Sequence, residues 1–437
     1  LGMGYDGSSM RALRLQYFLA FAVLGSIVPY LPVLLREGKG LTDGQVGDIA
    51  SLMGWAIVLG PVAMTLLADL RIESRTLLGL TFLGSGAALA ALLTTEGFWP
   101  IFAVFGVHAL LAMPIIQVQD GLNFTVQQQR REAGEAAVPY HRVRVWGTLG
   151  FMVPAVVLYV WLAADGPIEV ALVVAVAFSL LGVVNAFWLP AVRAKTTGSA
   201  GPPPDIPAPR NGTNGGRPTL AQRAAQLPTV AALRAMCQPR VAVFAGAMWL
   251  CHLAAAGYYT FYPVYLTEQI GIENQWLGLI ANIGVTVEIG FMLAFGFLLR
   301  RLGLRALMAI AAGSMALRLG LLYAWPNVWI AVGTQLLHGF TVLLIHVAPP
   351  VYLNQRAEPS FRSSIQGLYA MLVYGTGRIV GNMAAGRVAE WDLLAVFAVG
   401  AALCALAAVL FAVIFSDRGS SDPGKRELDS LQSAHQV

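Results

Sequence analysis

The sequence predicts an all-α membrane protein with twelve transmembrane helices, and three features lead to this fold class. Only 12% of the 437 residues are charged and 57% are hydrophobic, whereas about 25% of an average soluble protein is charged. Apolar stretches of about 20 residues, the length that crosses a bilayer as a helix, recur along the chain. The second half of the chain also repeats the pattern of the first. This composition argues against a soluble enzyme, a nucleic-acid-binding module and a disordered scaffold.

Twelve apolar runs bounded by charged or turn-forming residues are the predicted spans. Those in the first half of the chain lie at 12–35, 45–68, 76–95, 98–125, 143–164 and 168–190. Those in the second half lie at 240–266, 276–299, 304–325, 327–352, 365–386 and 391–415. Short breaks rich in turn formers separate neighbouring spans, as at Trp325-Pro326-Asn327.

One long break divides the twelve spans into two groups of six. It contains the run GPPPDIPAPRNGTNGGRP, which cannot form a core and is typical of a flexible linker. An amphipathic surface helix is expected at 219–235, after this run. The predicted organisation is a tail or cloning scar at 1–10, an N-terminal six-helix bundle at 11–190, a linker at 191–239, a C-terminal six-helix bundle at 240–416 and a tail at 417–437.

The distribution of basic residues predicts the orientation in the membrane. With the N-terminus inside the cell, most of the 28 Lys and Arg residues fall in cytoplasmic segments, and the outer loops hold only Arg36, Lys39 and Arg387. Cytoplasmic loops carry such an excess of positive charge. We therefore expect a multi-pass protein of the inner cell membrane, with both termini and the linker in the cytoplasm.

A constant shift of 231 residues, the separation of Tyr30 and Phe261, aligns the two halves without gaps. It places three segments over one another: Tyr30-Leu31-Pro32 over Phe261-Tyr262-Pro263, Gly47 over Gly278, and Leu122-Asn123 over Leu353-Asn354. Apolar sequences match Leu and Ala by chance, but they do not match Pro and Gly positions together. The alignment therefore predicts an internal duplication of six spans.

Short motifs beside the spans carry a resemblance to a known family. The loop after span 8 holds Gly296, Arg301, Gly303 and Arg305, and the loop after span 2 holds Asp69, Arg71 and Arg75. Span 5 opens with YHRVRVWGTLG at 140–150, and further motifs lie at 335–339 and 362–369. The loop motif resembles that of the major facilitator superfamily. The other motifs resemble the branch that holds lactose permease, nucleoside:proton symporters and phenylpropionate permeases.

The resemblance implies the fold and the general mechanism of this superfamily. Two pseudo-symmetric six-helix bundles would surround a central polar cavity and rock against each other, so that the cavity opens to each side of the membrane in turn. The basic residues of the loop motif would form cytoplasmic charge contacts that stabilise one conformer. They are not expected to bind substrate.

Five charged residues fall deep within the predicted spans, where a charge costs at least about 2.5–3.5 kcal/mol. They are Asp120, Arg144, Glu288, Arg318 and Arg378. A protein that keeps such residues must pair them or use them. They are therefore the candidates for mechanism.

Glu288 and Arg318 lie near the middles of spans 8 and 9 and are expected to form an ion pair. A static pair would only fix helix packing. In the alternative, the proton affinity of Glu288 changes as the cavity wets and dries and as Arg318 approaches or withdraws, which is what proton coupling requires. The resemblance implies this second role. His338 and His346 on span 10 are either further proton-relay groups or packing residues.

Asp120 and Arg144 form the second expected pair, in the N-terminal bundle. Gln117 shares a helix face with Asp120, and Arg144 lies deeper in its span than Arg142. The resemblance implies that an acid on span 4 and the second arginine of span 5 bind substrate. Alternatively, Asp120 is a gate charge at the cytoplasmic rim.

Arg378 is the unpaired member of this set, which holds three arginines and two acids. Tyr374, Arg378 and Asn382 share one face of span 11, so Arg378 pairs either with a substrate carboxylate or with backbone carbonyls. The excess of one arginine over the paired acids slightly favours an anionic substrate.

Aromatic residues within the spans are either packing groups or a platform for a sugar, nucleobase or phenyl ring: Tyr30, Trp146, Tyr258, Tyr262 and Tyr374.

These observations predict a secondary active transporter that moves a nucleoside, sugar or aromatic acid together with protons. A proton-independent uniporter and a non-transporting sensor on the same fold are the alternatives. The spans contain no nucleophile constellation, and the three cysteines have no metal-like spacing. We therefore expect no enzymatic activity, cofactor, metal or nucleic-acid partner. The expected partners are a small solute, protons and lipid, and the chain is expected to act as a monomer.

Overall fold

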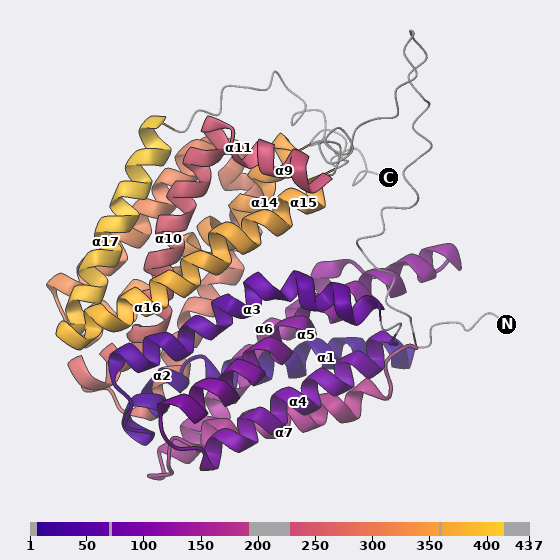
Figure 1. The fold of residues 1–437 in the computed structure, drawn as a ribbon, viewed down its shortest axis with the longest axis horizontal. Helices are drawn as coiled ribbons and strands as arrows, with labels where there is room; N and C mark the ends of the chain where they lie inside the picture. The colour runs from indigo at the N-terminus through magenta and orange to yellow at the C-terminus, as the bar shows by residue number, and fades with distance from the viewer. Residues whose placement is uncertain (1–6, 70–71, 192–227, 358–360, 415–437) are drawn as a thin grey trace, which may run out of the picture.

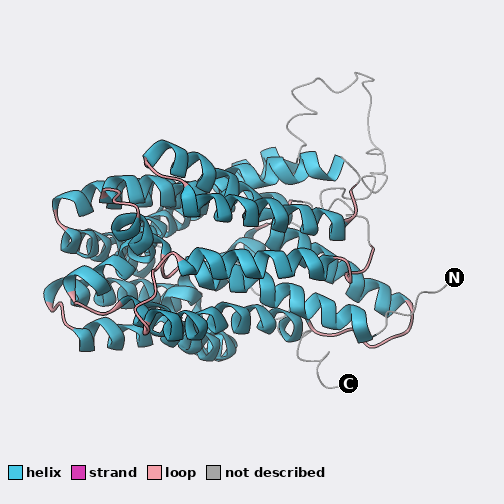
Figure 2. Cartoon of the chain, turned by 90° about the horizontal axis from the view of Figure 1, so that it is seen from below, coloured by secondary structure: helices cyan, strands magenta, loops and turns pink. Residues whose placement is uncertain are grey.

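The computed structural model of the chain describes residues 7–69, 72–191, 228–357 and 361–414, and these residues are helical almost throughout (Figures 1 and 2). The predicted terminal tails lie largely outside the described residues, and so does the Pro- and Gly-rich part of the linker. Of the expected surface helix, only the last part is described, and it is helical in α9 (Pro228–Met236).

The helices of the first half follow the predicted spans. In chain order they are α1 (Gly7–Ile27), α2 (Leu31–Val33), η1 (Leu34–Gly38), α3 (Asp43–Asp69), α4 (Ser74–Thr94), α5 (Phe98–Glu132), α6 (Tyr140–Leu162) and α7 (Val170–Ala186). Helix α5 continues beyond the predicted end of its span at 125. Glutamine and arginine are good helix formers, so the helix extends past the apolar segment that hydropathy detects.

The second half begins with α9 and α10 (Pro239–Val264), followed by η2 (Tyr265–Gln269), η3 (Asn274–Trp276) and α11 (Leu277–Ala324). The tenth span is broken into α12 (Val328–Gly333), η4 (Thr334–Leu337), α13 (His338–Val342), η5 (Leu343–Val347) and α14 (Ala348–Arg356). The chain ends in α15 (Arg362–Tyr369), η6 (Ala370–Gly375), α16 (Thr376–Trp391), α17 (Leu393–Val409) and η7 (Leu410–Ile414).

Eight helices of the described chain are long and apolar enough to cross a membrane. One of them, Asn274–Ala324, contains predicted spans 8 and 9, which are separated by a kink at Gly303 with φ of 73°. This backbone conformation favours glycine because other residues are strained there. The remaining predicted spans correspond to α3, α7 and the segment α15–η6–α16. The all-α membrane fold is therefore confirmed.

The helices form two bundles, with α1–α7 in one and α9–α17 in the other (Figure 1). The predicted duplication is confirmed at the end of the first span of each bundle. The π-helical turns η1 and η2 are related by the shift of 231 residues, and so are Gly40 (φ 65°) and Gly271 (φ 77°). The amide of Gly40 donates to the Arg36 carbonyl at 3.1 Å, and that of Gly271 donates to the Thr267 carbonyl at 3.2 Å.

Glycines allow the helices of each bundle to approach closely. A Cβ atom added at Gly150 of α6 would lie 2.0 Å from the carbonyl oxygen of Phe18 in α1. At Gly381 of α16, which the same shift relates to Gly150, it would lie 2.7 Å from the carbonyl oxygen of Leu253 in α10. Small residues permit this packing in membrane helices, and the two bundles use it at equivalent places.

The bundles meet along two seams. Along α3 and α16, a Cβ atom at Gly47 would lie 2.4 Å from the carbonyl oxygen of Asn382, and the Asn382 side-chain amide donates to the carbonyl of Ala50 at 3.1 Å. Along α6 and α11, the Asn282 side-chain amide donates to the carbonyl of Met152 at 3.0 Å. Figure 1 shows α3 and α16 side by side at the junction of the bundles.

Candidate functional site

A small cavity lies within the C-terminal bundle, at the level of the predicted bilayer. Its polar lining consists of His252 and Tyr259 from α10, His346 from η5, Tyr374 from η6 and Arg378 from α16. Three apolar side chains complete the wall: Ala255, Ala256 and Ile345. The cavity volume of about 20 Å³ has room for a water molecule, so a solute requires further opening of the bundles.

Two π-helical turns supply part of the cavity lining. His346 lies in η5 and Tyr374 lies in η6, so each projects from a turn that contains an extra residue. Such turns are rare in α-helices and are frequent at functional sites, because they redirect side chains out of the regular helical register. Apolar periodicity does not reveal them in the sequence.

The polar side chains of the cavity contact one another. The rings of His252 and Tyr374 lie 4.8 Å apart, and Nη1 of Arg378 donates to the Tyr374 hydroxyl at 3.3 Å. His252 Nε2 shares a hydrogen bond of 3.2 Å with the hydroxyl of Tyr369. Nε of Arg378 is buried and has no hydrogen-bond partner. The residues that line the cavity include no Asp or Glu.

Glu288 of α11 lies within electrostatic range of a cation in the opposite bundle. Its carboxyl group is half-buried, and Arg144 of α6 is the cation that acts on it electrostatically. The ion pairs of the described residues do not include Glu288. Tyr259 also lies within electrostatic range of this carboxyl group. The charge nearest in effect to Glu288 thus belongs to the other bundle.

The predicted ion pair between Glu288 and Arg318 is wrong. Arg318 is only 1% exposed and points into the interior of its own bundle. Its guanidinium contacts the Tyr258 hydroxyl, bonds to Gln335 Oε1 at 2.7 Å and to His338 Nδ1 at 3.0 Å, and its Cζ lies 4.2 Å from the centre of the Tyr258 ring. Neutral acceptors thus bind both terminal nitrogens of the buried guanidinium, while its Nε has no partner. The kink at Gly303 places Glu288 and Arg318 on separate helical segments.

Asp120 and Arg144 also make no direct ion pair. Asp120 accepts hydrogen bonds from the hydroxyls of Tyr17 and Tyr140, the latter at 3.1 Å, and Arg144 acts on it at longer range. Tyr140 is the first residue of α6, at the predicted cytoplasmic side. This position favours the rim alternative for Asp120. The Arg144 guanidinium lies over the ring of Phe21, 3.9 Å from its centre.

The predicted aromatic platform is divided among several places. Tyr258 and Tyr262 flank Arg318, and the Tyr262 hydroxyl donates to the carbonyl of Ala331 at 2.8 Å. Tyr30 is fully buried and meets Gly278 of the other bundle, so it packs at a seam. Gln117 and Trp146 are exposed side chains. Of the predicted platform, only Tyr374 lines the cavity.

The residues of the loop motif lie away from the cavity. Arg75 pairs with Glu73 at 2.9 Å, Arg301 lies over the Phe297 ring at 5.0 Å, and the Arg305 guanidinium donates to the carbonyl of Ala412. A Cβ atom at Gly296 or Gly303 would meet no backbone within 4 Å. Arg71 and the side chain of Asp69 lie outside the described residues.

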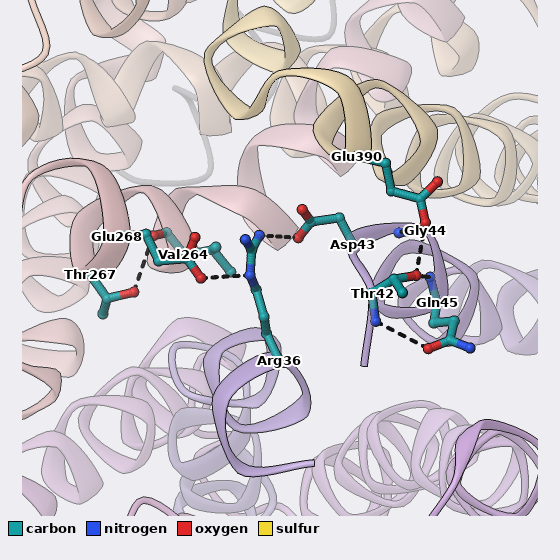
Figure 3. Close-up of polar contacts among 9 residues, drawn as sticks. All are labelled: Arg36, Thr42, Asp43, Gly44, Gln45, Val264, Thr267, Glu268 and Glu390. Carbon is teal, nitrogen blue, oxygen red and sulfur yellow. Dashed lines mark hydrogen bonds and ion pairs between the residues drawn. The ribbon is translucent and has the colours of Figure 1, made fainter. Parts of the chain in front are cut away.

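A further polar network joins the bundles at the predicted outer side (Figure 3). We call Arg36, Asp43, Glu268 and Glu390 the outer gate. Arg36 contacts Asp43 of its own bundle, and its Nε lies 2.5 Å from Glu268 Oε1 of the other bundle. Glu390 accepts hydrogen bonds from the Thr42 hydroxyl at 2.8 Å and the Gly44 amide at 3.1 Å.

Burial shapes the electrostatics of the outer gate. It raises the pKa of the Asp43 carboxyl above its ordinary value, and it raises the pKa of Glu268 in the same way, although the Arg36 guanidinium opposes both shifts. Nearby, Arg387 pairs with Asp48 across the bundles at 2.9 Å. These contacts join the two bundles at the predicted outer side.

Sequence reasoning missed several of these residues as site residues. Tyr17, Tyr140 and Gln335 hold the buried charges, and His252 and Tyr259 line the cavity. Tyr140 and Gln335 lie within the motifs beside spans 5 and 10, which is the one signal that pointed to them. The outer gate escaped detection because its partners come from helix ends in both halves of the chain.

Comparison with known proteins identifies the family to which this chain belongs. The model of the MFS_1 like family matches residues 10–399. The chain belongs to this family. It resembles the xanthosine permease of Escherichia coli strain K12, with 24% identity over 94% of this chain and 97% of the permease. It also resembles the nucleoside permease NupG of the same organism, with 23% identity over 86% of this chain and 87% of NupG.

The fold comparison agrees with the family assignment. The crystal structure of nucleoside transporter NupG superposes with a TM-score of 0.77 and 19% identity, and the match covers 94% of this chain and 99% of NupG. The prediction of a major facilitator fold with two pseudo-symmetric six-helix bundles is therefore confirmed. This MFS_1 like protein is a multi-pass membrane transporter of small solutes.

Proposed function

We propose that this MFS_1 like transporter carries a nucleoside or a related small organic solute together with a proton, by alternating access. The observation that carries the proposal is the position of Glu288, which lies half-buried in one bundle and within electrostatic range of Arg144 in the other. The names of its relatives, a xanthosine permease and a nucleoside permease, support a nucleoside-like solute.

The proposed coupling follows from the cost of charge at membrane depth. A carboxylate there is stabilised either by a nearby cation or by a bound proton. Because Arg144 belongs to the opposite bundle, its distance from Glu288 changes whenever the bundles rock. When Arg144 withdraws or binds the solute, Glu288 takes up a proton, and when Arg144 returns, the proton leaves. Transport of the solute is thereby tied to movement of a proton.

His346 gives this proton a path within the C-terminal bundle. Its side chain is exposed to the cavity, and Arg144 and Arg378 both lie within electrostatic range of it. Asp120, held by Tyr17 and Tyr140, serves in this proposal as a charge at the predicted cytoplasmic rim. We also propose that the protein acts as a monomer. Its basic loops support a location in the inner membrane with cytoplasmic termini.

The test of proton coupling is the substitution Glu288→Gln in purified protein reconstituted into liposomes. The amide cannot exchange a proton, so we expect exchange of labelled nucleoside across the membrane to continue while accumulation driven by a pH gradient is lost. Glu273→Gln, an exposed glutamate just before α11, is the control and is expected to accumulate solute normally. Uphill uptake by Glu288→Gln at the wild-type level would contradict the proposal.

A further inference from the structure

We propose that Arg378 binds an anionic group of the transported solute. The group is a delocalised anion, either the carboxylate of an aromatic acid or the ionised imide of an oxopurine nucleoside. The attached ring would lie against the aromatic wall formed by Tyr374 and His252. This inference rests on the proposed function in one respect, because it takes the cavity beside Arg378 as the place where solute binds.

The charges around the cavity favour an anion. Among the described residues, Asp120 is held by two tyrosines and Glu288 interacts with Arg144. Arg318 has three neutral hydrogen-bond partners inside its bundle. Arg378 has one neutral partner, the Tyr374 hydroxyl, and the two histidines of the cavity do not supply a negative charge. The cavity therefore holds one cation that its lining does not neutralise.

The hydrogen bonding of Arg378 is also incomplete. A guanidinium has five N–H donors, and the bond to the Tyr374 hydroxyl at 3.3 Å is long for a charged donor. Its Nε is buried and has no partner, as is also true of Arg318, but Arg378 lines the cavity. An arginine held at membrane depth with donors to spare is costly for a protein that does not use it. A planar anion with two oxygen acceptors would satisfy the free edge of the guanidinium.

Close packing of the backbone around Arg378 fixes the position of the helical segment that carries its guanidinium. A Cβ atom at Gly375 would lie 2.6 Å from the Val58 side chain of α3, and one at Gly377 would lie 2.7 Å from Cβ of His252 in α10. The segment that carries Arg378 is therefore packed against both bundles. Movement of α3 relative to α16 during alternating access would enlarge the cavity, whose volume in this structure is about 20 Å³.

The test compares pairs of solutes that differ in charge but little in shape. Uptake of 3-phenylpropionate and 3-phenylpropionamide, and of xanthosine and inosine, is measured with the full chain in liposomes. For wild type we expect preference for the anionic member of at least one pair by about tenfold or more, the effect of a charge-assisted hydrogen bond. The pair that shows it distinguishes an aromatic carboxylate from an ionised oxopurine.

Three variants locate the preference. Arg378→Gln should remove it while the neutral member is still transported, and Arg378→Lys should retain part of it because lysine keeps the charge without the planar fork. Arg142→Gln, an exposed arginine at the start of α6, should behave as wild type. Elution as a single monodisperse peak identifies variants that fold.

The outcomes separate this inference from the proposed proton coupling. Equal transport of charged and neutral members by wild type would overturn the anion site and leave the role of Glu288 intact. Equal loss of both members in folded Arg378→Gln would make Arg378 a structural residue and would also overturn it. If the anion preference depends on Arg378 but uptake does not depend on the pH gradient, the anion site would be supported and proton coupling would be contradicted. If wild type transported none of the four solutes, both the anion site and the proposed function would be contradicted.

Discussion

Arg318 shows how a buried cation is stabilised without a carboxylate. The side chain is 1% exposed, yet it has neutral partners from three segments: Tyr258 in α10, Gln335 in η4 and His338 in α13. The Tyr258 ring also faces the guanidinium, so one residue supplies both a hydroxyl and a π surface. Arg318 therefore ties together the helices of the C-terminal bundle.

Removal of the Tyr258 hydroxyl tests this role. In Tyr258→Phe the ring remains and the hydrogen bond is lost, so one donor of a buried guanidinium is left unsatisfied. We expect the free energy of unfolding in detergent micelles to fall by about 1–3 kcal/mol. Tyr323→Phe, an exposed tyrosine at the end of α11, should leave it unchanged. An equal effect of the two substitutions would show that the Arg318 contacts contribute little.

At the scale of helices, glycine positions decide how closely neighbours pack. Gly150 lies where α6 crosses α1, and a Cβ atom there would lie 2.0 Å from the carbonyl oxygen of Phe18. Backbone cannot move aside as a side chain can, so α1 and α6 must separate to admit a methyl group. Gly121 in α5 has nothing within 4 Å of its added Cβ atom.

These two glycines give a matched pair of substitutions. Gly150→Ala should lower the free energy of unfolding by about 1–3 kcal/mol, as overpacking does. Gly121→Ala should be neutral or stabilising by up to about 1 kcal/mol, because alanine is the better helix former. Both are measured by thermal unfolding monitored with circular dichroism. Similar effects of the two substitutions would argue against close contact between α1 and α6.

Most of the helices could be predicted from the sequence, but their internal contacts could not. Hydropathy marks where a span crosses the membrane, and the repeat of 231 residues fixes equivalent corners such as Gly40 and Gly271. Neither hydropathy nor the repeat gives the rotation of each helix about its axis, and this rotation decides whether Arg318 meets Glu288 or Gln335. The π-helical turns that carry His346 and Tyr374 add a further rotation that no apolar pattern records.

At the scale of the whole molecule, two seams and the outer gate hold the bundles together on one side. Asp43 is only 8% exposed and Glu268 is 31% exposed, and Arg36 is the cation between them. The pair of Arg387 and Asp48 also crosses the junction, but Arg387 is 53% exposed. Exposed pairs contribute little because solvent screens them. Arg36 should therefore control closure of the predicted outer side far more than Arg387 does.

Arg36→Gln tests this control. The substitution leaves Asp43 and Glu268 near each other without a cation, so the closed state becomes costly and the two carboxylates regain water only when the bundles part. Spin labels at Glu96 and Glu273, exposed residues at the predicted outer ends of the two bundles, report this opening as a longer distance. We expect the ratio of open to closed molecules to rise by about tenfold or more.

Arg387→Gln in the same labelled background is the control, and it should raise the ratio much less. Exposed Cys237 is replaced by Ser so that only the introduced cysteines are labelled. A distance distribution that Arg36→Gln leaves unchanged would mean that the glycine seam of α3 and α16 is sufficient for closure. Equal opening by both variants would mean that net charge at the junction matters more than burial. Only a large and selective effect of Arg36 supports the outer gate as the element that a transport cycle must open.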